Sequence, residues 1–150
     1  MKSALGKSAA MENYYQTLVK EGLFETMKDV MLTAIAIGFI NNKRVPIAKY
    51  GGDAIKEHIF KDEMDFLNII AVLSTKDIKI LLSENKDEKY KMLEEYAEGG
   101  MEILVGEVFT GQYTDATKIL DYIKSFAPQI STEKKDLSDL FGAIIDEMDE

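Results

Sequence analysis

The chain of 150 residues has no cysteine, no tryptophan and a single histidine. Without cysteine it can form no disulfide, no thiol nucleophile and no Cys/His zinc site. The lone histidine, His58, excludes an HExxH motif, and no GxSxG turn presents a serine. Gly6-Lys7-Ser8 matches the end of a phosphate-binding loop, but the upstream glycine and a preceding strand are missing from the pattern. We therefore predict no catalytic residue, no bound metal and no cofactor.

Long apolar runs are also missing. A membrane-spanning helix needs about 20 consecutive apolar residues. The longest run, residues 30–40, is much shorter and is interrupted by Thr33 and Gly38. Lys2 and Lys7 near the N-terminus precede no apolar segment of the kind found in secretory signals. These absences predict a cytoplasmic protein with no membrane contact.

Net positive charge is confined to the first third of the chain. The net charge is −9, but residues 1–50 carry +3, residues 51–128 carry −7 and residues 129–150 carry −5. An acidic chain repels the phosphate backbone at long range, so nucleic acid is expected to be contacted only indirectly. An acidic surface favours a basic protein partner, although solubility alone also explains it.

Helical spacing of apolar residues dominates the remaining pattern. We predict that Thr26 caps a helix over residues 27–39, which would be the central core element, with Asp29 in its first turn. Asp53 is expected to cap a short helix, and Thr114 or Asp115 a late one. No segment alternates like a half-buried strand, so the predicted fold is an all-α, compact multi-helix domain. The other predicted helices span residues 9–20, 53–60, 62–73, 77–82, 89–109 and 114–126.

The C-terminal part is predicted to form a separate amphipathic helix. The prediction divides the chain into a helical core domain (1–128), a linker (129–135) and an acidic helix (136–150). This helix could bind in an apolar groove of another protein. It could equally fold back onto its own domain or onto a second subunit of a homo-oligomer. Its apolar side chains recur at helical spacing at Leu137, Leu140, Phe141, Ile144, Ile145 and Met148.

The segment 94–104 combines two features that destabilise a helix. Gly99 and Gly100 each cost about 1 kcal/mol relative to alanine inside a helix. The segment carries four glutamates. Three of them recur at four-residue spacing, where like charges on a helix repel one another. The pattern indicates close backbone packing on one side and a cationic partner on the other. The predicted partner-binding carboxylates are Glu94, Glu95, Glu98 and Glu102.

Residues 41–52 form a predicted loop with the one basic cluster of the chain. Lys43, Arg44 and Lys49 could contact phosphate, and Tyr50 could stack on a base. Three cations are few for tight binding, because each neutralised phosphate adds only about one unit to the salt dependence. An ordinary exposed loop is the alternative.

Three blocks of sequence resemble the Dnd system-associated protein 4 family, small proteins encoded beside bacterial DNA-phosphorothioation and anti-phage loci. The first runs from Phe24 through Met31 into Ala34–Phe39, the second is Lys43–Pro46, and the third is Glu94–Leu104. In the third, Glu98 stands where the family pattern EEYANGG has asparagine. The blocks lie within about residues 12–110, and the C-terminal region is outside the resemblance.

The resemblance implies a non-enzymatic accessory component of a defence or DNA-modification system. We expect it to bind a larger protein, an ATPase or a nuclease, through the four glutamates above and the apolar tail residues 137, 140, 141, 144 and 145. The alternative is a nucleic-acid-associated regulator that uses the basic cluster of the 41–52 loop.

Overall fold

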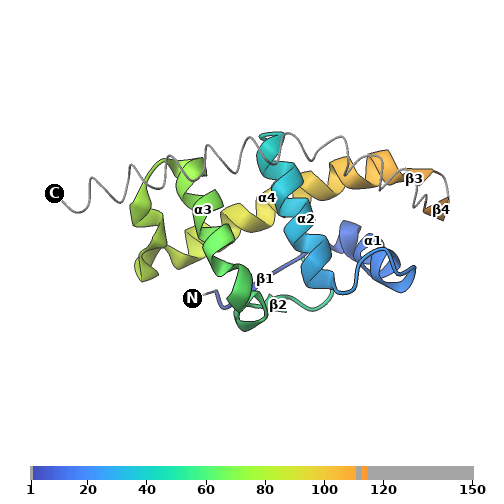
Figure 1. Ribbon diagram of the computed structural model, residues 1–150, viewed down its shortest axis with the longest axis horizontal. Coiled ribbons are helices and arrows are strands. Elements are labelled where there is room, and N and C mark those ends of the chain that lie inside the picture. Colours follow the sequence, from blue (N-terminus) through green and yellow to red (C-terminus); the bar gives the residue numbers. More distant parts are fainter. Residues whose placement is uncertain (1, 111–112, 115–150) are drawn as a thin grey trace.

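The computed structural model describes residues 2–110 and 113–114 of the chain. The predicted all-α fold is confirmed: four α-helices and three short 3-10 helices form nearly all of the described regular structure. Figure 1 shows α2 crossing the long helix α4, with α1 and α3 on opposite sides of that crossing. In chain order the elements are β1 (Ala4–Leu5), α1 (Ala9–Lys20), α2 (Met27–Ile40), β2 (Ile55–Lys56), η1 (Glu57–Glu63), α3 (Met64–Thr75), η2 (Ile78–Leu81), η3 (Ser83–Asn85), α4 (Lys86–Val108), β3 (Phe109–Thr110) and β4 (Tyr113–Thr114).

Side-chain caps fix the starts of the first two α-helices. The Ser8 hydroxyl accepts a hydrogen bond from the Met11 N–H at 3.1 Å. Thr26 caps α2 as predicted, accepting from the Asp29 N–H at 3.2 Å while its own hydroxyl donates to the Asp29 carboxylate. Each cap satisfies a backbone donor that the first helical turn leaves without a partner.

Residues 53–60 depart from the prediction. Instead of a helix capped by Asp53, the chain forms the short strand β2 and then η1. β2 pairs with β1 in an antiparallel register that joins Ala4 to Lys56. A second antiparallel pair, β3 with β4, includes Thr114. The prediction of no strands was therefore wrong, because strands of two residues are too short to show an alternating pattern.

The middle of helix α4, rather than that of α2, is buried on all sides. Every residue from Tyr96 to Met101 is buried, whereas α2 keeps Leu32 and Ala36 partly exposed. Glycine makes the close crossing of the two helices achievable. A Cβ on Gly100 would lie 1.7 Å from the Ala34 carbonyl oxygen. The predicted close backbone packing at the glycine pair is thus confirmed.

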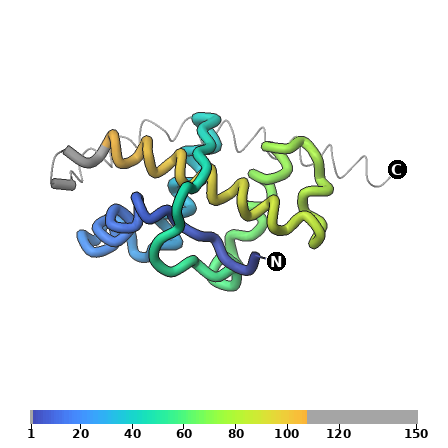
Figure 2. The backbone as a smooth tube through the Cα atoms, turned by 180° about the vertical axis from the view of Figure 1, so that it is seen from behind, coloured from blue at the N-terminus to red at the C-terminus, as the bar shows by residue number. Residues whose placement is uncertain are grey.

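The 41–52 loop and the N-terminal segment lie together on one side of the molecule. Figure 2 shows the loop crossing both α4 and the N-terminal segment. The Val45 N–H donates to the Glu95 carbonyl at 3.0 Å, and the Ala9 N–H donates to the Lys49 carbonyl at 2.8 Å. Two segments of extended backbone therefore cover α4 where its carboxylates lie.

The predicted linker (129–135), the predicted C-terminal helix (136–150) and the late helix from residue 115 lie outside the described residues. Among the described helices, none is both long and apolar enough to span a membrane.

Candidate protein-binding site on helix α4

Glu94 lies at the centre of the site and is 1% exposed. Its carboxylate accepts hydrogen bonds from the Gly6 N–H, from the Lys2 ammonium and from the Tyr50 hydroxyl, the last at 3.0 Å. A buried carboxylate is stable only when its lone pairs have donors and its charge has a counterion. Glu94 has both, and all three donors come from its own chain.

The groups around Glu94 have shifted pKa values. Burial acts to lower the pKa of Lys2, but the hydrogen bond and the negative charge of Glu94 outweigh it, and the pKa is raised. Burial, followed by the Glu94 hydrogen bond, raises the pKa of Tyr50. Lys2 also lies over the Tyr50 ring, 5.0 Å from its centroid. The cluster therefore holds Lys2 charged and Tyr50 protonated.

Glu98, one turn further along α4, is also buried, at 8% exposure. Burial raises its pKa, the charge of Glu102 raises it further, and a hydrogen bond with Ser8 opposes the shift. The buried Tyr15 hydroxyl has its pKa raised by burial and by the charges of Glu98 and Glu12. Glu98 and Ser8 thus join α4 to the start of α1.

Glu95 and Glu102 lie nearer the surface and pair with the basic loop. The Arg44 guanidinium is 2.8 Å from Glu95, whose side chain is 12% exposed. The Lys43 ammonium is 2.9 Å from Glu102, and both of these side chains are about two-fifths exposed. Arg44 also lies over the Tyr96 ring, 5.5 Å from its centroid. Within the described residues, Glu95 and Glu102 therefore pair with cations of the same chain.

The four carboxylates predicted to bind a partner therefore differ in how far they are exposed to solvent. The structure turns Glu94 and Glu98 inward, leaves Glu95 mostly covered, and exposes Glu102. Of the predicted phosphate contacts, Lys43 and Arg44 are neutralised by these carboxylates. Lys49 is exposed and takes part in no ion pair within residues 2–110 and 113–114. The predicted tail contacts at 137, 140, 141, 144 and 145 lie outside the described residues.

A strand does precede Gly6-Lys7-Ser8, contrary to the sequence analysis, but the lysine does not face a phosphate site. The Lys7 side chain is 1% exposed, and its ammonium lies 2.9 Å from Glu12 Oε2 and 3.2 Å from the Met27 sulfur. It also lies over the Tyr15 ring, 5.5 Å from the centroid. Lys7 thus ties the N-terminal segment to α1 and α2.

Sequence reasoning missed a second polar cluster, which joins η1, α3 and the first turns of α4. The Glu57 carboxylate accepts from the Tyr90 hydroxyl and pairs with the Lys86 ammonium, each at 2.7 Å. Hydrogen bonds from Lys86 and then Tyr90 lower the pKa of Glu57. Lys89 is buried and donates to Asn68 at 2.9 Å, and burial together with the Lys86 charge lowers its pKa. No sequence motif joins these residues, because their spacing is set by packing.

His58 lies at an open hollow of about 700 Å³ between the N-terminal segment and η1. Ser3, Asp53 and Glu57 also line this hollow, and His58 itself is exposed. Within the part of the chain that the structure describes, no three acidic, histidine or cysteine residues gather closely enough to hold a metal ion.

The chain matches one family model over most of its length. The model describes DNA sulphur modification system-associated protein 4, and it matches residues 2–140. The chain belongs to this family. The match extends the resemblance seen in residues 12–110 to both sides, and it includes most of the C-terminal region that the sequence analysis had left outside. Comparisons with curated proteins and with solved structures gave no match.

Family membership associates the chain with a DNA sulphur modification system. The family description names an associated protein rather than a reaction, which fits an accessory role.

Proposed function

We propose that this chain is a non-catalytic, cytoplasmic accessory subunit of a bacterial DNA sulphur modification and defence system. It acts by binding a larger protein of that system, an ATPase or a nuclease. Family membership supports the system, and the distribution of charge supports a protein partner over nucleic acid. The chain is acidic, and two of the three cations of its basic loop, Lys43 and Arg44, are paired with carboxylates of α4.

The observation that carries the proposal is the exposed Lys43–Glu102 ion pair. An exposed ion pair contributes only about 0–1 kcal/mol, so a cationic side chain of a partner can replace Lys43 at little cost. Glu94 and Glu98 cannot act this way, because they are buried and have partners within the fold. In this proposal Glu102, together with the small exposed part of the Glu95 side chain, forms the polar contact with the partner protein.

The apolar tail supplies the main anchor. Full burial of a large apolar side chain is worth about 1.5–3 kcal/mol before ordering costs. The binding free energy from burying several such side chains exceeds that from ion pairs of one or two surface carboxylates. We therefore assign the larger share of affinity to Leu137, Leu140, Phe141, Ile144 and Ile145.

The test is co-expression of the tagged full-length chain with its genomic neighbours, followed by affinity capture and light scattering. A stoichiometric complex is expected. Truncation after residue 130, or Phe141→Asp with Ile144→Asp, should abolish capture while the chain keeps a cooperative thermal unfolding transition. Glu102→Lys should weaken capture, whereas Glu107→Lys, the same charge change at another exposed position of α4, should not.

Two results would count against the proposal. A complex that survives loss of the tail would remove the tail from the interface. Salt-dependent DNA binding by the purified chain, lost with Lys43→Gln and Arg44→Gln and without any protein complex, would favour the nucleic-acid-associated regulator instead.

A further inference from the structure

The outer face of α3 carries apolar side chains that the core does not use. Phe66 is 36% exposed, and Ile69 and Leu73 are partly exposed and lie outside the core cluster. These residues are separated by three and four positions, so they form one stripe along the helix.

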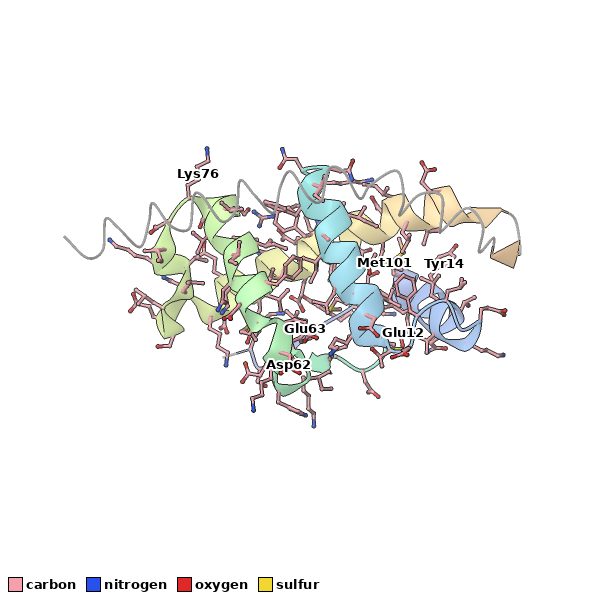
Figure 3. All side chains as sticks on the ribbon, viewed as in Figure 1. Glu12, Tyr14, Asp62, Glu63, Lys76 and Met101 are labelled. Carbon is pink, nitrogen blue, oxygen red and sulfur yellow. The ribbon has the colours of Figure 1, made fainter. Side chains whose placement is uncertain are left out.

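Opposite charges lie at the two ends of this stripe. Asp62 lies in η1, just before α3, and Asp65 lies in the first turn of α3. Lys76 directly follows the last residue of α3. All three are exposed, and none forms an ion pair with another residue of the described ranges 2–110 and 113–114. Figure 3 shows Asp62 and Lys76 at opposite ends of the η1–α3 column.

The order of these groups along the chain is symmetric about Ile69. Asp62, in η1, lies seven residues before it, and Lys76, the C-cap residue of α3, lies seven residues after it. Phe66 and Leu73 lie three and four residues from Ile69 on its two sides. A helix face with this symmetry is complementary to itself when a second copy runs antiparallel to it.

We propose that α3 is a homodimer interface in which a second copy of this chain packs antiparallel, with the two-fold axis at Ile69. Asp62 and Asp65 of each chain then face the partner's Lys76, and Phe66 packs near the partner's Leu73. A contact of three helical turns is small, so the dimer is weak and depends on concentration.

The charges at the two ends of α3 favour an antiparallel second copy over a parallel copy or the chain's own C-terminal segment. A parallel second copy would place Asp62 against the partner's Asp62 and leave Lys76 against the partner's Lys76. The acidic C-terminal segment, with a net charge of −5 over residues 129–150, would bring further carboxylates to Asp62 and Asp65. Only the antiparallel copy places opposite charges together at both ends. The interface does not involve Glu102, so it is independent of the proposed partner binding.

Sedimentation velocity of the purified full-length chain, from micromolar to millimolar concentration, tests the proposal. The unmodified chain should show a reversible monomer–dimer equilibrium. Lys76→Asp should weaken the dimer about tenfold or more, because two attractive contacts become repulsive by symmetry. Ile69→Asp should abolish it by placing two carboxylates at the axis. Lys20→Asp, the same charge change on exposed α1, should leave it unchanged.

Charge reversal provides the decisive variant. Asp62→Lys and Asp65→Lys combined with Lys76→Asp should restore dimerisation, since the opposite charges again face one another. Thermal melting by circular dichroism confirms that each variant is folded. A chain that stays monomeric at all concentrations would overturn the proposal, and so would a dimer indifferent to Lys76→Asp. A dimer lost with Phe141→Asp but kept with Ile69→Asp would place the contact in the tail instead.

Discussion

The carboxylate of Glu94 accepts a hydrogen bond from the backbone N–H of Gly6, 88 residues earlier in the chain. The same carboxylate binds the Lys2 ammonium and the Tyr50 hydroxyl. A single buried side chain on α4 therefore fixes both the N-terminal segment and the end of the 41–52 loop. Gly6 fits here because a Cβ would lie 2.5 Å from the Tyr50 ring.

Glu94→Gln should destabilise the fold by about 2 kcal/mol. The amide keeps the shape of the side chain but removes the negative charge, and hydrogen bonds to charged groups contribute about 1.5–3 kcal/mol. It also presents an N–H group to the Gly6 N–H or the Lys2 ammonium, which are themselves donors. Urea denaturation followed by circular dichroism measures the change.

The matched control is Glu88→Gln on the exposed face of the same helix. We expect a change within about 0.5 kcal/mol there, as for surface substitutions in general. Equal stabilities of the Glu94 and Glu88 variants would contradict the role assigned to the buried carboxylate.

Gly100→Ala should lower the free energy of unfolding by about 1–3 kcal/mol or more. That range is typical when an extra methyl group is forced into a packed core. The added Cβ would lie 1.7 Å from the Ala34 carbonyl oxygen, a backbone atom that cannot rotate away, so α2 and α4 must separate. Denaturant midpoints of the two proteins give the difference.

Gly106→Ala is the control on the same helix, because a Cβ there meets nothing within 4 Å. It should stabilise the chain by about 0.5–1 kcal/mol through the higher helix propensity of alanine. If both glycine variants shifted stability in the same direction, close helix crossing would not be what requires Gly100.

Local signals predicted the helices well where the relevant interactions are themselves local. Thr26 and Asp29 stand three residues apart, and their cap is formed as the sequence indicates. The glycine pair at 99–100 correctly indicated a close approach, because a glycine inside a helix has a cost that packing must offset. The all-α class followed from these periodic segments.

The candidate site depended on contacts between distant residues, and the sequence could not reveal them. Glutamates at four-residue spacing resemble a solvated helix face, so the burial of Glu94 and Glu98 was not expected. The groups that compensate them, Lys2, Ser8 and Tyr50, belong to other segments and carry no shared motif. The pairing of β1 with β2 is non-local in the same way.

Exposed and buried ion pairs in this site should respond differently to substitution. Lys43→Gln removes the exposed partner of Glu102, and we expect a loss of about 0–1 kcal/mol that shrinks further at high salt. Lys2→Gln removes the counterion of the buried Glu94 and should cost more, about 1.5–3 kcal/mol, because Glu94 loses a charged donor but keeps those of Gly6 and Tyr50. Urea denaturation at low and high salt distinguishes the two, and similar losses for both variants would contradict the burial of Glu94.

Glu98 should make the stability of the fold depend on pH. Burial raises its pKa, so between the ordinary glutamate pKa of about 4.3 and the raised value the folded state binds more protons than the unfolded state. Stability from this group is therefore present in acid and is lost as the pH rises through that interval. Glu98→Gln removes the titration and retains a side chain that can hydrogen-bond Ser8.

The free energy of unfolding of Glu98→Gln, relative to the unmodified chain, should thus be most favourable at neutral pH. This difference should decline as the pH falls from the raised pKa of Glu98 to about 4.3, and it should level off below that, where Glu98 is protonated in both the folded and the unfolded state. Urea denaturation of both proteins across this range of pH gives the difference. A difference that grows on acidification would mean that the folded chain stabilises the Glu98 carboxylate, and that its contact with Ser8 outweighs burial.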